Sequence, residues 1–347
     1  MRKYLSLLLA LCLCALSLFG CAPASENSIT VYNWEDYINP EVIDLFEEET
    51  GIQVNYVRFT TNEEMYIKLE KGGASYDVAF PSDYMIERMI QNDMLLPLDH
   101  EKLPNFTNNA QWLQDPDYDP DSLYSVPYMW GTVGILYNTT VTGGEIDSWG
   151  AMWDEKYKKN VLMMDSVRDS LGVTLCYLGY DLNTRDEAQL EEAKQKLIEQ
   201  KESGVLLAYG VDEIKDKLVG GEAALGLVWS GDALTSMALN EDLAYCVPKE
   251  GSNVWVDGMV IPATAKNVEG AHLFIDFMMR PEIAAMNSEY IGYSTPNEAA
   301  LEILGPEYTE DPTFNPPQDV LDRCTFFHDV SDAAKLYNDI WIEITAN

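Results

Sequence analysis

The stretch VYNWEDYINP, residues 31–40, joins an apolar run to the beginning of a helix-like pattern. The apolar run, 29–32, has the length of a short strand and stops at Asn33. After Pro40, apolar residues return at helical spacing, at Val42, Leu45 and Phe46. The stretch therefore predicts a strand, a turn and a helix in succession, with aromatic rings and carboxylates in the turn.

The same order of strand, short turn and helix recurs along the rest of the chain. Further strands are predicted at 51–57, 76–80 and 224–229, and helices at 62–70, 81–93, 186–203 and 230–239. Ser82 or Asp83 can cap the helix that begins near residue 81. A Pro- and Asn-rich loop, 99–127, interrupts the pattern. Strands that alternate with helices are typical of an α/β fold with largely parallel sheets.

The N-terminal segment has the layout of a secretory signal. Two basic residues precede an almost wholly apolar run, 4–19, which is short for a membrane span. The run closes with Gly20-Cys21, which is similar to a bacterial lipobox. We therefore expect a signal peptide, 1–20, and a tether lipidated on Cys21, 21–27, which would place the protein outside the cytoplasm on a membrane. An N-terminal anchor helix is the alternative.

Charge and cysteine content exclude several classes of protein. With 58 acidic and 22 basic residues, the formal net charge is −36, which excludes non-specific nucleic-acid binding and favours cationic partners. The hydrophobic share of 47% indicates a globular protein with a substantial core. Outside the signal, Cys176, Cys246 and Cys324 are odd in number and scattered. They favour buried thiols over a disulfide framework or a zinc site, although a single disulfide stays open.

The sequence contains no recognisable catalytic or metal-binding motif. It has three histidines and lacks HExxH, GxSxG, P-loop and CxxC patterns. In the acidic loop that begins at Asp115, Pro120 and Val126 occupy the positions where an EF-hand needs Gly and Glu. We therefore expect no metal, no cofactor and no enzymatic activity. Paired acids of a glycosidase, acting outside the cytoplasm, are the remaining enzyme hypothesis.

Aromatic and polar residues gather where the predicted strands end. Three motifs come directly after a strand or at its last residue: WEDY at 34–37, PSDY at 81–84 and WS at 229–230. In open α/β sheets, ligands bind outside the carboxyl ends of the strands. Trp255 and Asp257 alternate within the stretch 253–262, so in a strand both would point to one face. Tyr293 lies in a predicted tight turn.

Indole and phenol rings beside carboxylates favour one kind of ligand. The face of an indole attracts a cation by ~0.5–2 kcal/mol, and aromatic walls also bury methylene chains. A carboxylate fixes a charged nitrogen through a charge-assisted hydrogen bond. The pattern therefore predicts a site for an aliphatic cation whose amines have a defined spacing.

Six motifs, in order, are similar to those of the spermidine/putrescine-binding proteins of bacterial ABC importers: VYNWEDYINP, YDVAFPSDYMIERM, YSVPYMWG, LGLVWSGDA, WVDGMVIPATAKN and IGYSTPN. The resemblance extends through nearly the whole chain after the signal. It implies a two-lobed periplasmic-binding-protein fold with a hinge and an interlobe ligand cleft. It also implies a monomer that captures putrescine or spermidine and delivers it to the permease subunits of an ABC importer.

The resemblance further implies which residues bind the ligand. Asp257 and Asp169 would each pair with an amine, and Ser82 and Asp36 would complete the lining. An aromatic box would surround the methylenes: Trp34, Tyr37, Tyr84, Trp229, Trp255 and Tyr293.

The chain departs from the family pattern at several of these positions. Ser166 stands where a second acid is common, and Asp169 is shorter than the usual Glu. Phe327 occupies a position where an amide is often found, whereas Glu35 replaces a neutral residue and restores one negative charge. The loss of polar groups at one end favours the diamine putrescine over spermidine.

The family's chain crossings lie near residues 131, 255 and 301. They imply a first lobe of 28–130 plus 256–300 and a second lobe of 131–255 plus 301–347. A polyamine would supply the positive charge that makes burial of the site carboxylates favourable, so that the lobes close only on ligand. Two further hypotheses remain, a binding protein for another solute (a sugar, an amino acid or thiamine) and a surface interaction protein without a small ligand.

Overall fold

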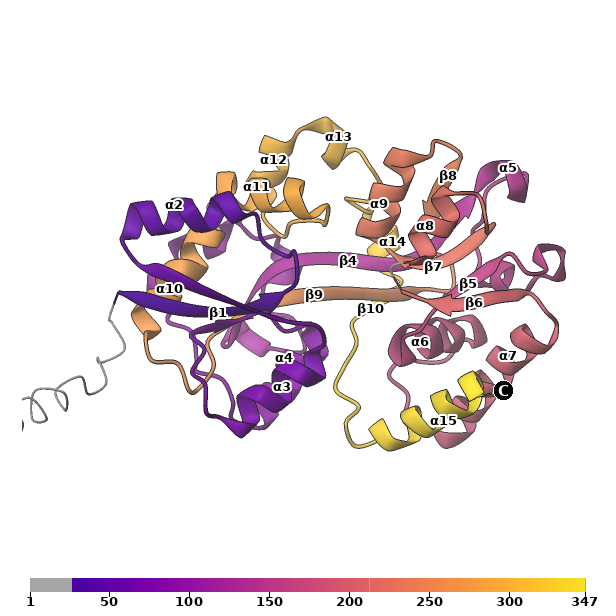
Figure 1. The fold of residues 1–347 in the computed structure, drawn as a ribbon, viewed down its shortest axis with the longest axis horizontal. Coiled ribbons are helices and arrows are strands. Elements are labelled where there is room, and N and C mark those ends of the chain that lie inside the picture. The colour runs from indigo at the N-terminus through magenta and orange to yellow at the C-terminus, as the bar shows by residue number, and fades with distance from the viewer. Residues whose placement is uncertain (1–26, 212, 347) are drawn as a thin grey trace, which may run out of the picture.

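The computed structural model describes residues 27–211 and 213–346. The predicted signal peptide, most of the tether and Cys21 lie outside the described residues. Two lobes flank a pair of long antiparallel strands, β4 (Ser125–Asn138) and β9 (Ser252–Val260), which run side by side through the middle of the molecule (Figure 1). The strand order along the sheet is β2-β1-β3-β9-β4-β7-β5-β6, so the sheet continues from one lobe into the other.

The first lobe contains the three N-terminal strands and the helices packed on them. Its strands are β1 (Ser28–Trp34), β2 (Gln53–Phe59) and β3 (Val78–Ala79). Its helices are α2 (Pro40–Thr50), α3 (Asn62–Lys71), α4 (Asp83–Gln91), α10 (Val268–Met278), α11 (Pro281–Ile291), α12 (Glu298–Leu304) and α13 (Pro306–Thr309). The predicted loop 99–127 is broken by 3-10 helices, η2 (His100–Lys102), η3 (Pro104–Asn108), η4 (Gln111–Leu113) and η5 (Pro120–Ser122).

The second lobe is built around the parallel strands that continue the sheet beyond β4. Its strands are β5 (Val161–Met164), β6 (Leu206–Gly210), β7 (Leu225–Trp229) and β8 (Leu243–Cys246). Its helices are α5 (Thr139–Thr142), η6 (Trp149–Trp153), η7 (Glu155–Tyr157), α6 (Val167–Leu178), α7 (Glu187–Glu202), α8 (Glu213–Val219), α9 (Ser230–Leu239) and α15 (Ala334–Ala346). The segment between the lobes carries α14 (Gln318–Leu321) and β10 (Cys324–Thr325).

Local sequence explains why the first strand–turn–helix unit forms. The Asn39 side chain accepts a hydrogen bond from the amide of Glu41 and caps α2, and Pro40 occupies the first turn, where no amide donor is needed. Gly51 ends α2 at φ 70°, a backbone conformation that suits glycine. Ile29 and Val31 face one core cluster of the first lobe and Tyr32 faces another, as alternation along a strand requires.

The strand–helix pattern of the sequence is confirmed, but the sheet is mixed. The α/β prediction holds, a helix follows the first strand as predicted, and α9 begins at Ser230 as predicted. The prediction of largely parallel sheets is wrong at the centre, because β4 pairs antiparallel with β7, β8 and β9. β3 is shorter than predicted, Val78–Ala79. Before it, the carboxylate of Asp77 accepts hydrogen bonds from the backbone amides of Thr30, Lys266 and Asn267.

The cores of the two lobes are separate clusters of buried apolar side chains. Phe46, Phe80 and Phe274 are buried in the first lobe, and Trp149, Leu171 and Leu227 in the second. The thiols of Cys176, Cys246 and Cys324 are free. In the part of the chain that the structure describes, none of the helices combines the length and the apolar character that a membrane crossing requires.

Candidate functional site

The predicted site residues lie on elements that face each other across the two lobes. Trp34 ends β1, and Ser82 and Tyr84 begin α4 directly after β3. From the second lobe, Ser166 caps α6 after β5, and Trp229 ends β7. Trp255 and Asp257 lie on the crossing strand β9, and Tyr293 follows α11.

Asp257 is the centre of the first-lobe part of the site. One carboxylate oxygen accepts a hydrogen bond from the hydroxyl of Tyr37 at 2.7 Å, and the other accepts one from the hydroxyl of Ser82 at 2.6 Å. The side chain is 7% exposed. Burial raises the pKa of Asp257 from 3.8 to about 6, although the two hydroxyl hydrogen bonds lower it in part. A buried carboxylate held by neutral donors is poised to receive a cation.

Ser82 explains why the beginning of α4 belongs to the site. Ser82 occupies the N-cap position of α4, but its side chain makes no capping hydrogen bond and donates to Asp257 instead. Asn62 donates to the Ser82 hydroxyl at 3.0 Å and to the Tyr84 hydroxyl at 3.1 Å. The Tyr84 hydroxyl donates to Glu63 at 3.2 Å. Asn62 and Glu63 therefore fix two predicted ligand-binding hydroxyls, and neither residue was predicted from the sequence.

Three aromatic residues of the predicted box, Tyr37, Trp255 and Tyr293, form a chain of ring contacts beside Asp257. Trp255 and Tyr293 meet edge to face, with ring centres 5.1 Å apart, and Tyr293 lies 6.2 Å from the ring of Tyr37. The indole of Trp34 donates to the carbonyl of Phe80 at 2.8 Å, which holds this ring at the end of β1. The rings are rigid walls of the kind that pack on methylene groups.

The second-lobe part of the site is built around Asp169. Ser166 caps α6 and donates its hydroxyl to the carboxylate of Asp169 at 2.5 Å. Asp169 is buried, and this burial raises its pKa, while hydrogen bonds from Ser166 and Trp229 and the charge of Arg168 lower it in part. The structure therefore brings Ser166, Asp169 and Trp229 together, as a second acidic corner with an aromatic wall.

Arg168 and Asp83 are charged residues between the lobes that were not predicted from the sequence as site residues. The guanidinium of Arg168 lies over the ring of Phe327 at 4.3 Å and 5.9 Å from the ring centre of Tyr84. It donates to the carbonyl of His328 at 3.0 Å. Asp83 is buried and accepts from the amide of Tyr84 at 2.7 Å, and its burial raises its pKa well above the ordinary value.

A motif that could have revealed Arg168 was present in the sequence. Arg168 lies inside the stretch DSVRDSLG, directly before the predicted site residue Asp169. In the structure, the ring of Phe327 covers the guanidinium of Arg168, and the side chain of Asn183 accepts a hydrogen bond from it. Phe327 is buried at this position and packs on Arg168 and close to Gly172.

Two predicted residues lie at the margin of the cluster. Glu35 is exposed and pairs with Arg58 on β2 at 3.3 Å, so its charge has a partner outside the predicted site. Asp36 is also exposed and adopts φ 51° in the turn after β1.

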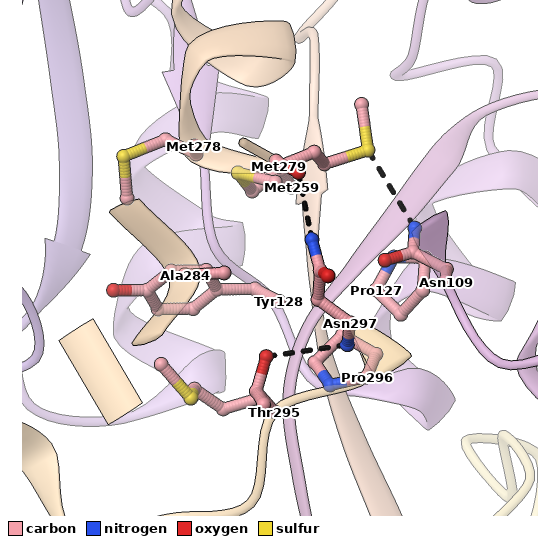
Figure 2. A pocket seen from close by; sticks show the side chains of 11 residues that line it. Asn109, Pro127, Tyr128, Met259, Met278, Met279, Ala284, Thr295, Pro296 and Asn297 are labelled. Atoms are coloured by element: carbon pink, nitrogen blue, oxygen red, sulfur yellow. Dashed lines mark hydrogen bonds between the residues drawn. The ribbon is translucent and has the colours of Figure 1, made fainter. Parts of the chain in front are cut away.

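A small cavity in the first lobe is distinct from this cluster (Figure 2). The space in it that the centre of a water-sized sphere can occupy is about 10 Å³, roughly what one water molecule needs. Its wall includes four methionines, Met129, Met259, Met278 and Met279, and none of the predicted site residues. A polyamine does not fit there. Among the described residues, no cluster of His, Cys, Asp or Glu could hold a metal ion.

Comparisons with known proteins identify the class to which this architecture belongs. A family model described as "Bacterial extracellular solute-binding protein" matches residues 41–316. The chain belongs to this family of extracytoplasmic solute-binding proteins, which are not enzymes.

Individual relatives support the same assignment over the full chain. A "Spermidine/putrescine-binding periplasmic protein" of Salmonella typhimurium is 35% identical over 349 residues, covering 100% of this chain and 99% of the relative. The structure of a spermidine/putrescine ABC transporter substrate-binding protein from Streptococcus pneumoniae is 40% identical with a TM-score of 0.84, covering 92% of this chain and 99% of that chain. A lipoprotein of Treponema pallidum, 27% identical with a TM-score of 0.82, covers 91% and 99% respectively. The predicted resemblance and the periplasmic-binding-protein fold are confirmed.

Proposed function

We propose that the protein captures a polyamine, putrescine or spermidine, between its two lobes and delivers it to the permease of an ABC importer. The observation that carries this proposal is Asp257. Its carboxylate is buried, and within the described residues the neutral hydroxyl groups of Tyr37 and Ser82 hold its two oxygens. An uncompensated buried carboxylate is costly, and an ammonium group relieves that cost.

With the second acidic corner, the candidate site has two carboxylates, and each can bind one charged end of a ligand. Asp169 and Asp257 belong to different lobes, and the rings of Trp229, Trp255 and Tyr293 lie around them. A chain with an ammonium group at each end and methylenes between would satisfy both carboxylates and pack on the rings. A sugar offers no cation, and an amino acid with two cationic groups also brings a carboxylate, which these acids would repel. The relatives are described as spermidine/putrescine-binding.

We further propose that the site favours putrescine over spermidine. Ser166 supplies a hydroxyl where a second acid would supply charge, and Phe327 covers the guanidinium of Arg168. An additional ammonium group at that end would find an apolar ring and a fixed positive charge. The end of the site near Phe327 is therefore better suited to a methylene than to a third nitrogen.

The proposed mechanism is lobe closure on the ligand. The lobes would comprise 28–130 plus 256–300 and 131–255 plus 301–347, with β4 and β9 as the hinge. We move the last crossing from residue 301 to the segment between Phe314 and Arg323, so that α12 and α13 stay with the first lobe. Ser294 of the first lobe donates to the carbonyl of Phe314, whereas Arg323 donates to that of Val247 in the second lobe. The closed monomer would dock on the permease, held at the membrane by lipid on Cys21.

The test is a titration of residues 22–347 by thermal unfolding and tryptophan fluorescence. Putrescine, spermidine, spermine and cadaverine are the ligands, with glucose, thiamine and an amino acid as controls. A ligand present at ~100 times its dissociation constant adds ~2.7 kcal/mol to the free energy of unfolding. A polyamine-selective shift supports the proposal. The protein is first freed of bound ligand by unfolding and refolding. No response to any polyamine then contradicts the proposal. A response to a control ligand alone would mean that the protein binds that class of solute instead.

A further inference from the structure

A cluster of charged residues joins the lobes at a second place, apart from Asp257. The imidazole of His328 lies between two carboxylates. Its Nδ1 is 3.2 Å from Oε2 of Glu87, and its Nε2 is 3.3 Å from Oδ2 of Asp117. The amide of Asp329 also donates to Oε2 of Glu87, at 2.7 Å. The side chains of His328 and Glu87 are about one quarter exposed, whereas Asp117 is more open to solvent.

The two sides of this cluster belong to different lobes. The backbone of His328 is fixed to the second lobe, because its amide donates to Asn183 at 2.8 Å and its carbonyl accepts from Arg168 at 3.0 Å. Glu87 lies on α4 of the first lobe, and Asp117 precedes Tyr118, which is buried in the first-lobe core. The imidazole therefore spans the boundary between the lobes, and its contacts exist only while the lobes are close together.

The two carboxylates beside His328 favour the protonated form of its imidazole. A neutral imidazole has one N–H group and can donate to one carboxylate, whereas imidazolium has two and can donate to both. The hydrogen bond to Glu87, followed by the charges of Asp117, Glu87 and Asp83, raises the pKa of His328, although burial lowers it in part. With both nitrogens facing acids, protonation and lobe contact favour each other.

Other charged groups next to the imidazole set the strength of this effect. Asp83 and Glu87 face it from α4 and Asp117 from the loop before η5. Arg168 holds its carbonyl from α6, and Arg185 donates to the carbonyl of Asp329 and pairs with Asp332. These two guanidinium groups oppose protonation, but each has its own acceptors on the second lobe and stays with His328 whether the lobes open or close.

We propose that protonated His328 latches the two lobes together, so that the closed, ligand-bound protein is stabilised as the pH falls from about 8.5 to 7. The affinity part of this inference rests on the proposed polyamine-binding function. The sign follows from linkage: the group binds its proton more tightly in the closed protein, so the latch is complete below the open-state pKa and is lost as the pH rises through the closed-state value.

The pH range separates this effect from the titrations of Asp257 and of putrescine. Asp257 has its pKa near 6 and is ionised above about pH 7. The two ammonium groups of putrescine, with pKa values of ~10, stay largely charged up to about pH 8.5, whereas the central ammonium group of spermidine lies between two positive charges and loses its proton more easily. Burial also raises the pKa of Asp83 and of Asp169, so the variant His328→Gln, which keeps both carboxyl groups, identifies the part of the pH dependence that belongs to His328.

The experiment measures the dissociation constants of putrescine and spermidine by calorimetry at about pH 7 and pH 8.5, for the wild type, His328→Gln and the control His100→Gln. Since partly exposed ion pairs contribute up to ~1 kcal/mol, we expect binding of the wild type to weaken about twofold to fivefold at the higher pH. His100→Gln should keep this dependence and His328→Gln should lose it. An equal pH dependence in His328→Gln and the wild type would overturn the latch.

A second measurement follows the His328 imidazole directly, with and without saturating putrescine. The pKa of the imidazole is measured by NMR in the wild type and in Glu87→Gln, with His328→Gln identifying the signal. We expect Glu87→Gln to lower this pKa in the protein with putrescine, where the lobes are close together, and an unchanged value there overturns the latch. If no polyamine binds at either pH while Glu87→Gln lowers the pKa, the proposed function fails and the contact between the lobes stands.

Discussion

Gly231 at the beginning of α9 lies directly against the ring of Tyr293. A Cβ atom on Gly231 would be 2.2 Å from Cε1 of Tyr293, which is far closer than two carbon atoms can approach. Gly231 belongs to the second lobe and Tyr293 to the first, and Tyr293 also meets Trp255 edge to face. The absence of a side chain at Gly231 therefore permits the approach of the lobes at the aromatic wall of the site.

Gly231→Ala should weaken polyamine binding without unfolding either lobe. Overpacking of this kind costs ~1–3 kcal/mol, so we expect the dissociation constant to rise about 10-fold to 100-fold. The strain disappears when the lobes separate, so the ligand-free melting temperature should stay within about 3 °C of the wild type. The control is Gly144→Ala, where no heavy atom lies within 4 Å of the added Cβ. Unchanged affinity in Gly231→Ala would show that ligand binding does not require this contact.

Asp257→Asn should remove most of the affinity for putrescine and spermidine. The amide is nearly isosteric but cannot compensate the charge of an ammonium group, and loss of one partner of a buried charge pair costs ~2–5 kcal/mol. We expect a rise of at least about 30-fold in the dissociation constant, measured by calorimetry. The exposed Asp44 on α2 offers a matched control, Asp44→Asn, which should bind like the wild type. Similar affinities for the two variants would remove Asp257 from the binding site.

The ligand-free protein should lose stability relative to Asp257→Asn as the pH rises. The pKa of Asp257 is raised by burial from 3.8 to about 6. A raised pKa means that the folded state holds the proton more tightly, so this contribution is present below about pH 4 and is lost through pH 6. Thermal unfolding from about pH 4.5 to 7.5 should show a relative loss on the order of 2–3 kcal/mol for the wild type. Parallel curves for both proteins would contradict the assignment, and saturating putrescine should restore the wild type near pH 7.

Phe327→Gln should shift the preference of the site towards spermidine. The ring of Phe327 lies on Arg168 and offers no hydrogen-bond acceptor, whereas a glutamine carbonyl accepts from an ammonium group. Hydrogen bonds to charged groups contribute ~1.5–3 kcal/mol, so the ratio of spermidine to putrescine affinity should rise about tenfold or more. Phe327→Leu tests packing alone and should leave the ratio unchanged. A ratio that is the same in Phe327→Gln and Phe327→Leu would mean that this end of the site does not select the ligand.

The fold could be predicted largely from local signals. Apolar strands that alternate with amphipathic helices specify an α/β chain, and caps such as Asn39 and Gly51 set the ends of α2. The antiparallel centre was not predicted, because β4 and β9 are distant in sequence and the first residues of β4 were assigned to the loop 99–127. They pair because the sheet that runs through both lobes has these two strands at its centre.

The candidate site, like the fold, was predicted only in part from the sequence. The residue types alone indicated aromatic rings beside carboxylates at strand ends, and so the chemistry of an aliphatic cation. Only the tertiary structure showed that Ser82 and Tyr37 hold Asp257, that Asn62 fixes Ser82, and that Glu35 pairs elsewhere. Hydrogen bonds between residues 20 to 220 positions apart depend on how whole elements pack, and no local pattern encodes that.

The charges between the lobes show most clearly why the sequence alone could not define the site. The sequence by itself determined that the chain is strongly acidic, which favours cationic partners. It could not indicate that Arg168 lies half-buried against the ring of Phe327, or that His328 faces Glu87 and Asp117 across the lobe boundary. The effect of a charge depends on burial and on its neighbours within a few ångströms, and the packing of the two lobes sets both.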